Sequence, residues 1–153
     1  MADALRLPAE QRYPAELAAL QANDHDPRPV GWRLSPRAVE TFILGSQDRE
    51  LSHAGGSTTI SKKFFGDDIL VQRAIVTLAS DRGLLLVGEP GTAKSWLSEH
   101  LSAAISGTSQ RIVQGTAGTT EEQIRYTWNY AMLIARGPSP EALIKSPVFR
   151  AME

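Results

Sequence analysis

The sequence predicts an α/β fold in which a parallel sheet is flanked by helices. An unbroken apolar run, Leu84 to Val87, lies between two turn signals, and helical patterns precede and follow it. Such a run is typical of a central parallel strand that is buried on both faces. The resulting order of helix, strand, glycine-containing loop and helix is the basis of this prediction.

Two helices are predicted before that core pattern begins. Residues 14–23, PAELAALQAN, form a short alanine-rich helical pattern with a narrow apolar face. Ser35 and Pro36 begin a second helix, because serine caps helix N-termini and proline suits the first helical position. Gly45 is its expected end, and residues 46–59 are expected to form a polar loop.

Two further helices flank the apolar run. Asp67 or Asp68 is expected to cap the first, whose apolar face contains Val71, Ile75 and Leu78. The second follows the glycine-rich loop and ends near Gly107. Its apolar positions are Leu97, Leu101, Ala104 and Ile105, a spacing that indicates an amphipathic helix.

The rest of the chain has a weaker pattern. Residues 111–113 are a candidate second strand, and Thr119 or Thr120 is expected to cap a short helix. Residues 126–136 mix aromatic and apolar side chains in a way that suits a hairpin or an extended insert. Residues 141–153 have a helical pattern, which Pro147 is expected to interrupt.

The stretch GEPGTAKS, residues 88–95, predicts a phosphate-binding loop. Small residues let backbone N–H groups converge on a phosphate, and a helix N-terminus adds partial positive charge. Lys94 and Ser95 follow Gly88 by six and seven residues, the spacing at which a lysine reaches the terminal phosphates and a hydroxyl reaches magnesium. The alternative is a glycine-rich turn with a surface lysine, which the agreement of spacing, strand and helix disfavours.

Ala93 departs from the common phosphate-loop pattern, which has glycine directly before the lysine. A methyl group is the smallest side chain that can replace a hydrogen there. We expect Ala93 to lie where the chain enters the helix, and alanine is the best helix former. The substitution is therefore expected to leave phosphate access intact.

The same eight residues resemble the phosphate loop of the MoxR-type AAA+ ATPases, in which Gly-x-Pro-Gly-x-Ala-Lys-Ser/Thr is the usual form. The resemblance extends over about residues 60–115 and is loose beyond them. It implies a P-loop NTPase domain of the AAA+ type at residues 60–153, preceded by a helical N-terminal extension at residues 1–59.

The resemblance also implies roles for individual residues. Lys94 would bind the β- and γ-phosphates of ATP, and Ser95 would bind magnesium. Phe65 and Gly66 match a segment that passes near the adenine, although phenylalanines are more often core residues. Trp96 lies beside the magnesium position, although packing is the favoured interpretation of its ring. The complete set of expected nucleotide-binding residues is Gly88, Glu89, Pro90, Gly91, Thr92, Ala93, Lys94, Ser95, Trp96, Phe65 and Gly66.

At the level of the whole protein, the resemblance implies chaperone-like remodelling of protein partners driven by ATP hydrolysis. It further implies a homo-oligomeric, hexameric ring and partners that carry von Willebrand factor A domains. Residues 126–136 resemble a hairpin through which such proteins contact partners or substrates.

Hydrolysis needs groups beyond a phosphate loop, including an acidic residue after a strand (Walker B) that helps to place magnesium. Glu121 and Glu122 follow a loop and are better explained as the first turn of a helix. We therefore expect no catalytic residue in this chain, an ATPase domain truncated before the Walker B strand, and nucleotide binding without turnover.

Two other functions compete with this interpretation. One is a non-catalytic, nucleotide-gated interaction module that binds a partner through the N-terminal segment and the hairpin. A P-loop kinase or GTPase is less favoured, because the sequence has no Asn-Lys-x-Asp pattern for reading guanine.

Composition excludes several classes. Hydrophobic residues make up 42%, charged residues 22%, and the net charge is -1, which argues against nucleic-acid binding. The sequence lacks an apolar run of about 18 residues and a signal-peptide pattern, so no membrane association and a cytoplasmic location are expected. It contains no cysteine, and its three histidines lack ligand spacing, so magnesium is the only expected metal.

Overall fold

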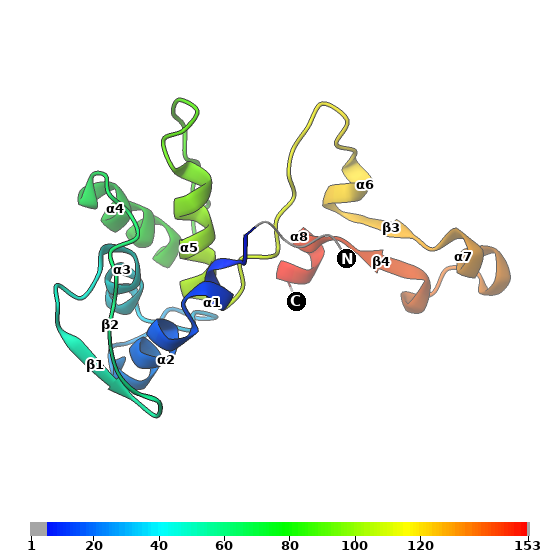
Figure 1. The fold of residues 1–153 in the computed structure, drawn as a ribbon. Coiled ribbons are helices and arrows are strands. Elements are labelled where there is room, and N and C mark those ends of the chain that lie inside the picture. The colour runs from blue at the N-terminus through cyan, green and yellow to red at the C-terminus, as the bar shows by residue number, and fades with distance from the viewer. Residues whose placement is uncertain (1–5, 153) are drawn as a thin grey trace. The chain divides into compact units, whose positions relative to one another are not determined.

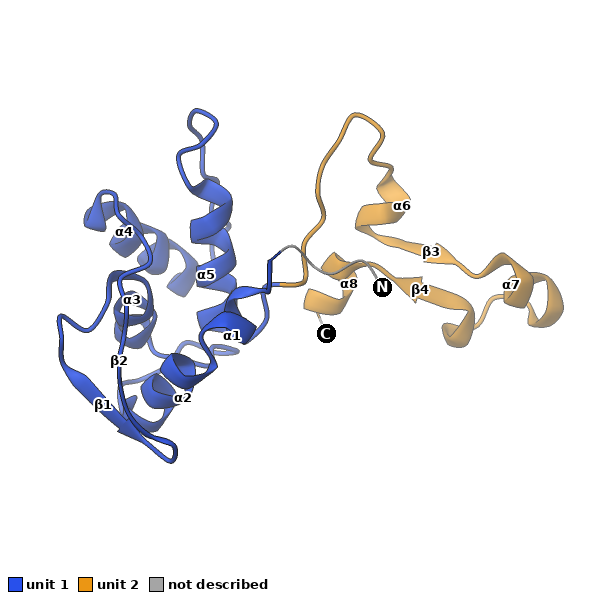
Figure 2. Ribbon diagram, viewed as in Figure 1, with its two compact units in different colours: residues 1–109 blue, residues 110–153 orange. Residues whose placement is uncertain are grey.

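The structure, a computed structural model, describes residues 6–152. The chain divides after Ser109 into two compact units, shown in different colours in Figure 2. The first unit thus contains both the predicted extension and the predicted phosphate loop. The boundary expected between residues 59 and 60 stays a prediction.

The first unit is mainly helical (Figure 1). Its helices are α1 (Ala9–Arg12), α2 (Pro14–Asn23), α3 (Pro36–Leu44), α4 (Asp68–Ala79) and α5 (Lys94–Ser106). Its strands are β1 (Glu50–His53) and β2 (Gly56–Thr59).

The helix boundaries predicted from capping residues are confirmed. The Ser35 hydroxyl accepts a hydrogen bond from the backbone N–H of Ala38, which begins α3. Asp67 accepts one from Ile69 at the start of α4. Gly107 ends α5 in the left-handed conformation, which glycine adopts without steric cost.

The core of the first unit forms around α3, which packs against α2, α4 and α5. The buried side chains that these helices contribute include Leu20, Val39, Phe42, Ile43, Val71, Ile75, Leu97 and Leu101. Full burial of one such side chain stabilises a fold by roughly 1.5–3 kcal/mol. This core therefore fixes α5, the helix that follows the predicted phosphate loop.

Residues 46–59 are more ordered than the predicted polar loop. β1 and β2 form an antiparallel hairpin in which Glu50 lies opposite Thr59. Leu51 is the one residue of the two strands that is buried, and β1 lies against α2. A single apolar residue is too weak a pattern to predict a strand from periodicity.

The predicted parallel sheet is absent from residues 6–152, so that prediction is wrong for the described chain. Both sheets in these residues are two-stranded and antiparallel. The run Leu84 to Val87 and residues 111–113 form no strand. Leu84 and Leu86 pack against the core of the first unit, but Leu85 and Val87 are 84% and 85% exposed. Burial on both faces, which the apolar run predicted, needs neighbouring strands and helices on each side.

The helices in the described part of the second unit are α6 (Glu121–Ile124), α7 (Tyr130–Arg136) and α8 (Pro147–Ala151), with the 3₁₀ turn η1 (Pro140–Ala142). Strands β3 (Tyr126–Trp128) and β4 (Leu143–Lys145) pair antiparallel. Thr120 caps α6 as predicted. The insert at 126–136 is a strand followed by a helix, and the helix predicted at 141–153 is confined to α8, which Pro147 begins.

Candidate functional site

The glycine-rich loop projects from the N-terminal end of α5 (Figure 1). Gly91 has φ +83°, a conformation that a side chain would strain. The Thr92 hydroxyl donates a hydrogen bond of 2.8 Å to the carbonyl of Glu89 and closes the turn. Gly88, Glu89 and Pro90 are exposed, so the outer half of the loop is open to a ligand.

Lys94, the first residue of α5, folds its side chain back over this loop. Its ammonium group donates to the carbonyls of Gly88 (2.9 Å) and Glu89 (2.5 Å) and to the hydroxyl of Thr92 (2.9 Å). These three contacts use all three donors of a lysine. The positive charge is therefore held at the loop by exchangeable, exposed carbonyl groups rather than by a carboxylate.

The N-terminus of α5 adds further groups that suit an anion. The helix has 13 residues and carries no acidic side chain in its first turn. Its first backbone N–H groups lack helical acceptors and carry the positive end of the helix dipole. Ser95 is exposed at the second helical position, and its hydroxyl is the kind of oxygen ligand that magnesium accepts. The residues present thus fit a magnesium–phosphate ligand.

Ala93 lies where the chain enters α5, as expected, but it does not have the helical conformation that the argument from helix propensity assumed. It is the N-cap residue, with φ 58° and ψ 21° in the left-handed region. For a residue with a side chain, this conformation costs roughly 1–2 kcal/mol. The high helix propensity of alanine therefore does not explain its presence at this position.

Trp96 packs against the first unit, which agrees with the favoured interpretation of its ring. Its indole N–H donates a hydrogen bond of 2.8 Å to the carbonyl of Lys63. Its ring lies 4.5 Å from that of His100, measured between centroids. A contact between Trp96 and nucleotide stays a prediction.

Phe65 and Gly66 differ from each other in their surroundings. Phe65 is 86% exposed, whereas the neighbouring Phe64 is buried in the core. A Cβ atom at Gly66 would lie 2.6 Å from the ring of Phe64, so glycine is required for this packing. The exposed ring of Phe65 is free to meet a ligand, but its contact with adenine stays a prediction.

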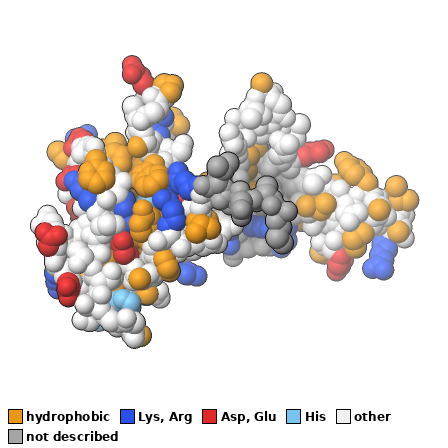
Figure 3. Space-filling view, in the orientation of Figure 1, with side chains coloured by type: hydrophobic (Ala, Val, Ile, Leu, Met, Phe, Trp, Pro, Cys, Tyr) orange, Lys and Arg blue, Asp and Glu red, His pale blue; other side chains and the backbone are white. Residues whose placement is uncertain are grey.

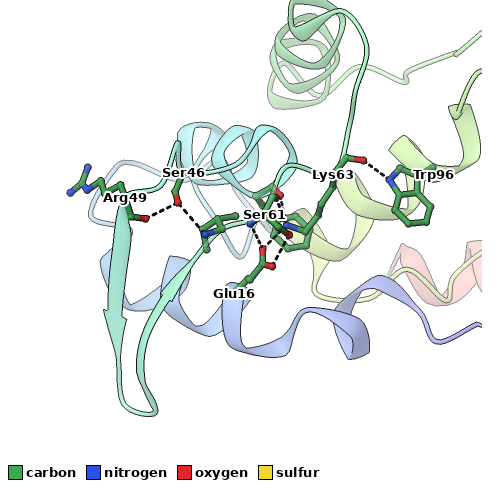
Figure 4. A network of polar contacts seen from close by, with 8 residues as sticks. Glu16, Ser46, Arg49, Ser61, Lys63 and Trp96 are labelled. Atoms are coloured by element: carbon green, nitrogen blue, oxygen red, sulfur yellow. Dashed lines mark hydrogen bonds and ion pairs between the residues drawn. The ribbon is translucent and has the colours of Figure 1, made fainter.

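A buried lysine lies at the centre of a polar network that the sequence did not predict (Figure 4). The ammonium of Lys63 contacts a carboxylate oxygen of Glu16 at 2.5 Å and the carbonyls of Phe42 (2.8 Å) and Ser61 (2.9 Å). Burial lowers the pKa of Lys63, while the hydrogen bond and charge of Glu16 oppose this shift. Because Glu16 and Lys63 are 47 residues apart, no local pattern signals the pair.

The remaining described residues offer no competing metal centre. Within residues 6–152, three or more His, Asp or Glu side chains nowhere gather as a metal-binding group. Glu121 and Glu122 occupy the first turn of α6, as predicted. On the face drawn in Figure 3, acidic and basic side chains are interspersed with apolar ones. Each described helix is too short or too polar to cross a membrane.

The part of the chain that contains the glycine-rich loop matches a known protein family. Residues 83–153, from just before the phosphate loop onward, match the family described as AAA domain (dynein-related subfamily). This match supports an AAA domain over these residues. The glycine-rich loop, Lys94 and the N-terminus of α5 described above are the features expected of a P-loop NTPase segment. The match does not distinguish the MoxR type within the AAA+ proteins.

One curated relative extends the similarity to nearly the whole chain. The chain is 50% identical over 147 residues to a protein of Escherichia coli (strain K12) named uncharacterized protein YehL. The alignment covers 96% of this chain but 38% of the relative. No solved structure matches the chain.

Proposed function

We propose that this chain is the ATP-binding part of a MoxR-like AAA+ ATPase and that residues 88–95 bind magnesium–ATP. The observation that supports this most strongly is the position of the Lys94 ammonium. It lies at the N-terminus of α5 and is held by two exposed carbonyls of the loop. Phosphate oxygens are stronger acceptors for the ammonium than these neutral carbonyls, because they carry negative charge and form an ion pair with the lysine as well as a hydrogen bond.

The roles of the individual groups follow from their chemistry. Lys94 exchanges the carbonyls of Gly88 and Glu89 for oxygens of the β- and γ-phosphates. The free N–H groups at the start of α5 bind the same phosphates. Ser95 holds magnesium, which neutralises phosphate charge when bound. Phe65 offers an exposed aromatic ring for the adenine.

The activity of the whole protein is part of the proposal. The chain spans 38% of the length of its curated relative, so hydrolysis would need groups outside residues 1–153. By resemblance to MoxR-type proteins, we propose ATP-driven remodelling of protein partners. A homo-oligomeric ring and partners with von Willebrand factor A domains belong to the same proposal.

Titration of the chain with magnesium–ATP in a calorimeter tests the site. Lys94→Ala removes a charged donor, so the Kd is expected to rise by about tenfold or more. Ser95→Ala is expected to weaken binding with magnesium more than binding without it. Lys62→Ala is the matched control, because Lys62 is an exposed lysine paired with Asp68 at 3.0 Å. Equal affinities for the Lys94 and Lys62 variants would refute the proposed site.

A further inference from the structure

We propose that the N-terminal segment from Arg6 to Glu16 is a functional part of the nucleotide site. In this proposal the segment fixes the first turn of α5 through Trp96, and Arg12 and Trp96 act as positioning residues. The inference rests on the proposed function, since it concerns how residues 94 and 95 are held in place for nucleotide.

Trp96 is held from several directions by groups distant in sequence. The guanidinium groups of Arg6 and Arg12 lie 4.2 and 4.6 Å from the centroid of its ring. At these distances the positive charges are attracted to the face of the indole ring. The ring also contacts His100, and its N–H is bonded to the Lys63 carbonyl. We call these five residues the Trp96 cage.

Glu99 connects the same two arginines to α5. One of its carboxylate oxygens accepts a hydrogen bond from Arg12 at 2.8 Å, and the other pairs with Arg6. The side chains of Arg12 and Glu99 are only 18% and 16% exposed. Residues three apart on a helix lie on one face, so Trp96 and Glu99 present a single surface to the N-terminal segment.

A second chain of contacts reaches Trp96 from α2. Glu16 binds the Lys63 ammonium, and the Lys63 carbonyl accepts the indole N–H of Trp96 (Figure 4). Glu16 also accepts a hydrogen bond of 2.9 Å from the hydroxyl of Ser61. The segment therefore contacts the first two turns of α5 both directly and through Lys63.

The position of Trp96 gives these contacts functional consequences. Trp96 directly follows Ser95 and is two residues from Lys94. A helix is stiff, so contacts that hold the Trp96 side chain also fix how α5 is rotated about its axis. That rotation sets the directions in which the side chains of Lys94 and Ser95 leave the helix. Misplacement of a binding group by about 1 Å can cost a large factor in function. The contacts at Trp96 thus control where the ammonium and the hydroxyl point.

Core packing alone does not explain the cage. Leu97 and Leu101 already anchor α5 in the core. In the cage, two buried polar atoms among the described residues, Nε of Arg12 and Nε2 of His100, have no hydrogen-bond partner. Such groups are costly to bury and are uncommon without a specific role.

Thermodynamic reciprocity supplies the test. If the docked segment favours nucleotide binding, nucleotide must favour docking of the segment by the same factor. Hydrogen exchange of residues 9–16 in the full chain is therefore expected to slow when magnesium–ATP is added. Residues 143–145, in β4 of the second unit, provide an internal control and are expected to exchange at an unchanged rate.

Variants complete the experiment. Arg12→Gln is expected to raise the Kd for magnesium–ATP by about fivefold or more, and Arg12→Lys should restore part of the affinity. Arg28→Gln is the matched control, because Arg28 lies in the same N-terminal region but pairs with Asp24 at 3.2 Å. Thermal melting without nucleotide shows whether each variant is folded.

The outcomes separate this inference from the proposed function. If the wild type binds magnesium–ATP and Lys94→Ala binds it about tenfold or more weakly, the nucleotide site stands. Equal affinities for Arg12→Gln and Arg28→Gln would then overturn the positioning role alone. Unchanged exchange at residues 9–16 would overturn it as well, whether or not Arg12→Gln folds. If the wild type fails to bind magnesium–ATP, both proposals are refuted.

Discussion

Replacement of Ala93 by glycine is expected to stabilise the first unit, although glycine is normally destabilising near a helix. Ala93 has φ 58° at the N-cap of α5 and offers no side-chain cap. Relief of the left-handed conformation contributes roughly 1–2 kcal/mol. Glycine also increases the conformational entropy of the unfolded chain, which lowers the free energy of unfolding by roughly 0.4–1 kcal/mol. From the midpoints of these two ranges, the net expected gain in the free energy of unfolding is about 0.8 kcal/mol.

Urea unfolding followed by tryptophan fluorescence measures this change. Ala18→Gly is the matched control, because Ala18 is exposed within α2 and glycine there is expected to cost about 1 kcal/mol. The two substitutions should thus change stability in opposite directions. A loss of about 1 kcal/mol for Ala93→Gly would show that Ala93 is helical and would refute the reasoning from its backbone conformation.

Three other perturbations test the first unit. Gly66→Ala places a methyl group against the ring of Phe64 and should cost roughly 1–3 kcal/mol in urea unfolding, whereas Gly83→Ala, with open space around it, should change little. Ser35→Ala removes a helix cap and should cost about 1 kcal/mol by the same assay. Burial lowers the pKa of His100, although its hydrogen bond to the carbonyl of Trp96 opposes this shift. As the pH falls, the imidazole is therefore protonated at a higher pH in the unfolded chain than in the folded chain. The free energy of unfolding should therefore fall as the pH drops below about 6.5, and His100→Gln should reduce this pH dependence. The same pH dependence in His100→Gln and wild type between about pH 7.5 and 5.5 would contradict this prediction.

Local sequence signals predicted the longer helices of the first unit, α2 to α5, well and the strands poorly. The helix starts at residues 36 and 68 and the glycine end of α5 each depend on one capping residue, whose effect is local. The run Leu84 to Val87 has the composition of a buried strand, but a strand also needs partners. Partners are a non-local property, and residues 6–152 supply none to this run.

The same distinction applies to the site. The candidate phosphate loop could be proposed from the sequence, because glycine, lysine and serine at fixed spacing lie within eight residues, and its binding of phosphate stays a prediction. The surroundings of Trp96 were not, because Arg12 and Glu99 are 87 residues apart and Glu16 and Lys63 are 47 apart. The conformation of Ala93 was also missed, since helix propensity describes the interior of a helix and not its cap.

In the first unit, the candidate phosphate loop is fixed mainly by the helix that follows it, α5, and less by the run Leu84 to Val87 that precedes it. On the N-terminal side, the run Leu84 to Val87 contributes no strand pairing and leaves two apolar side chains exposed. On the C-terminal side, Leu97 anchors α5 in the core, and the Trp96 cage anchors the same helix to α1. The groups that would bind phosphate, Lys94 and Ser95, lie on the anchored side. A change in the N-terminal segment should therefore alter nucleotide affinity more than a comparable change at Leu85 or Val87.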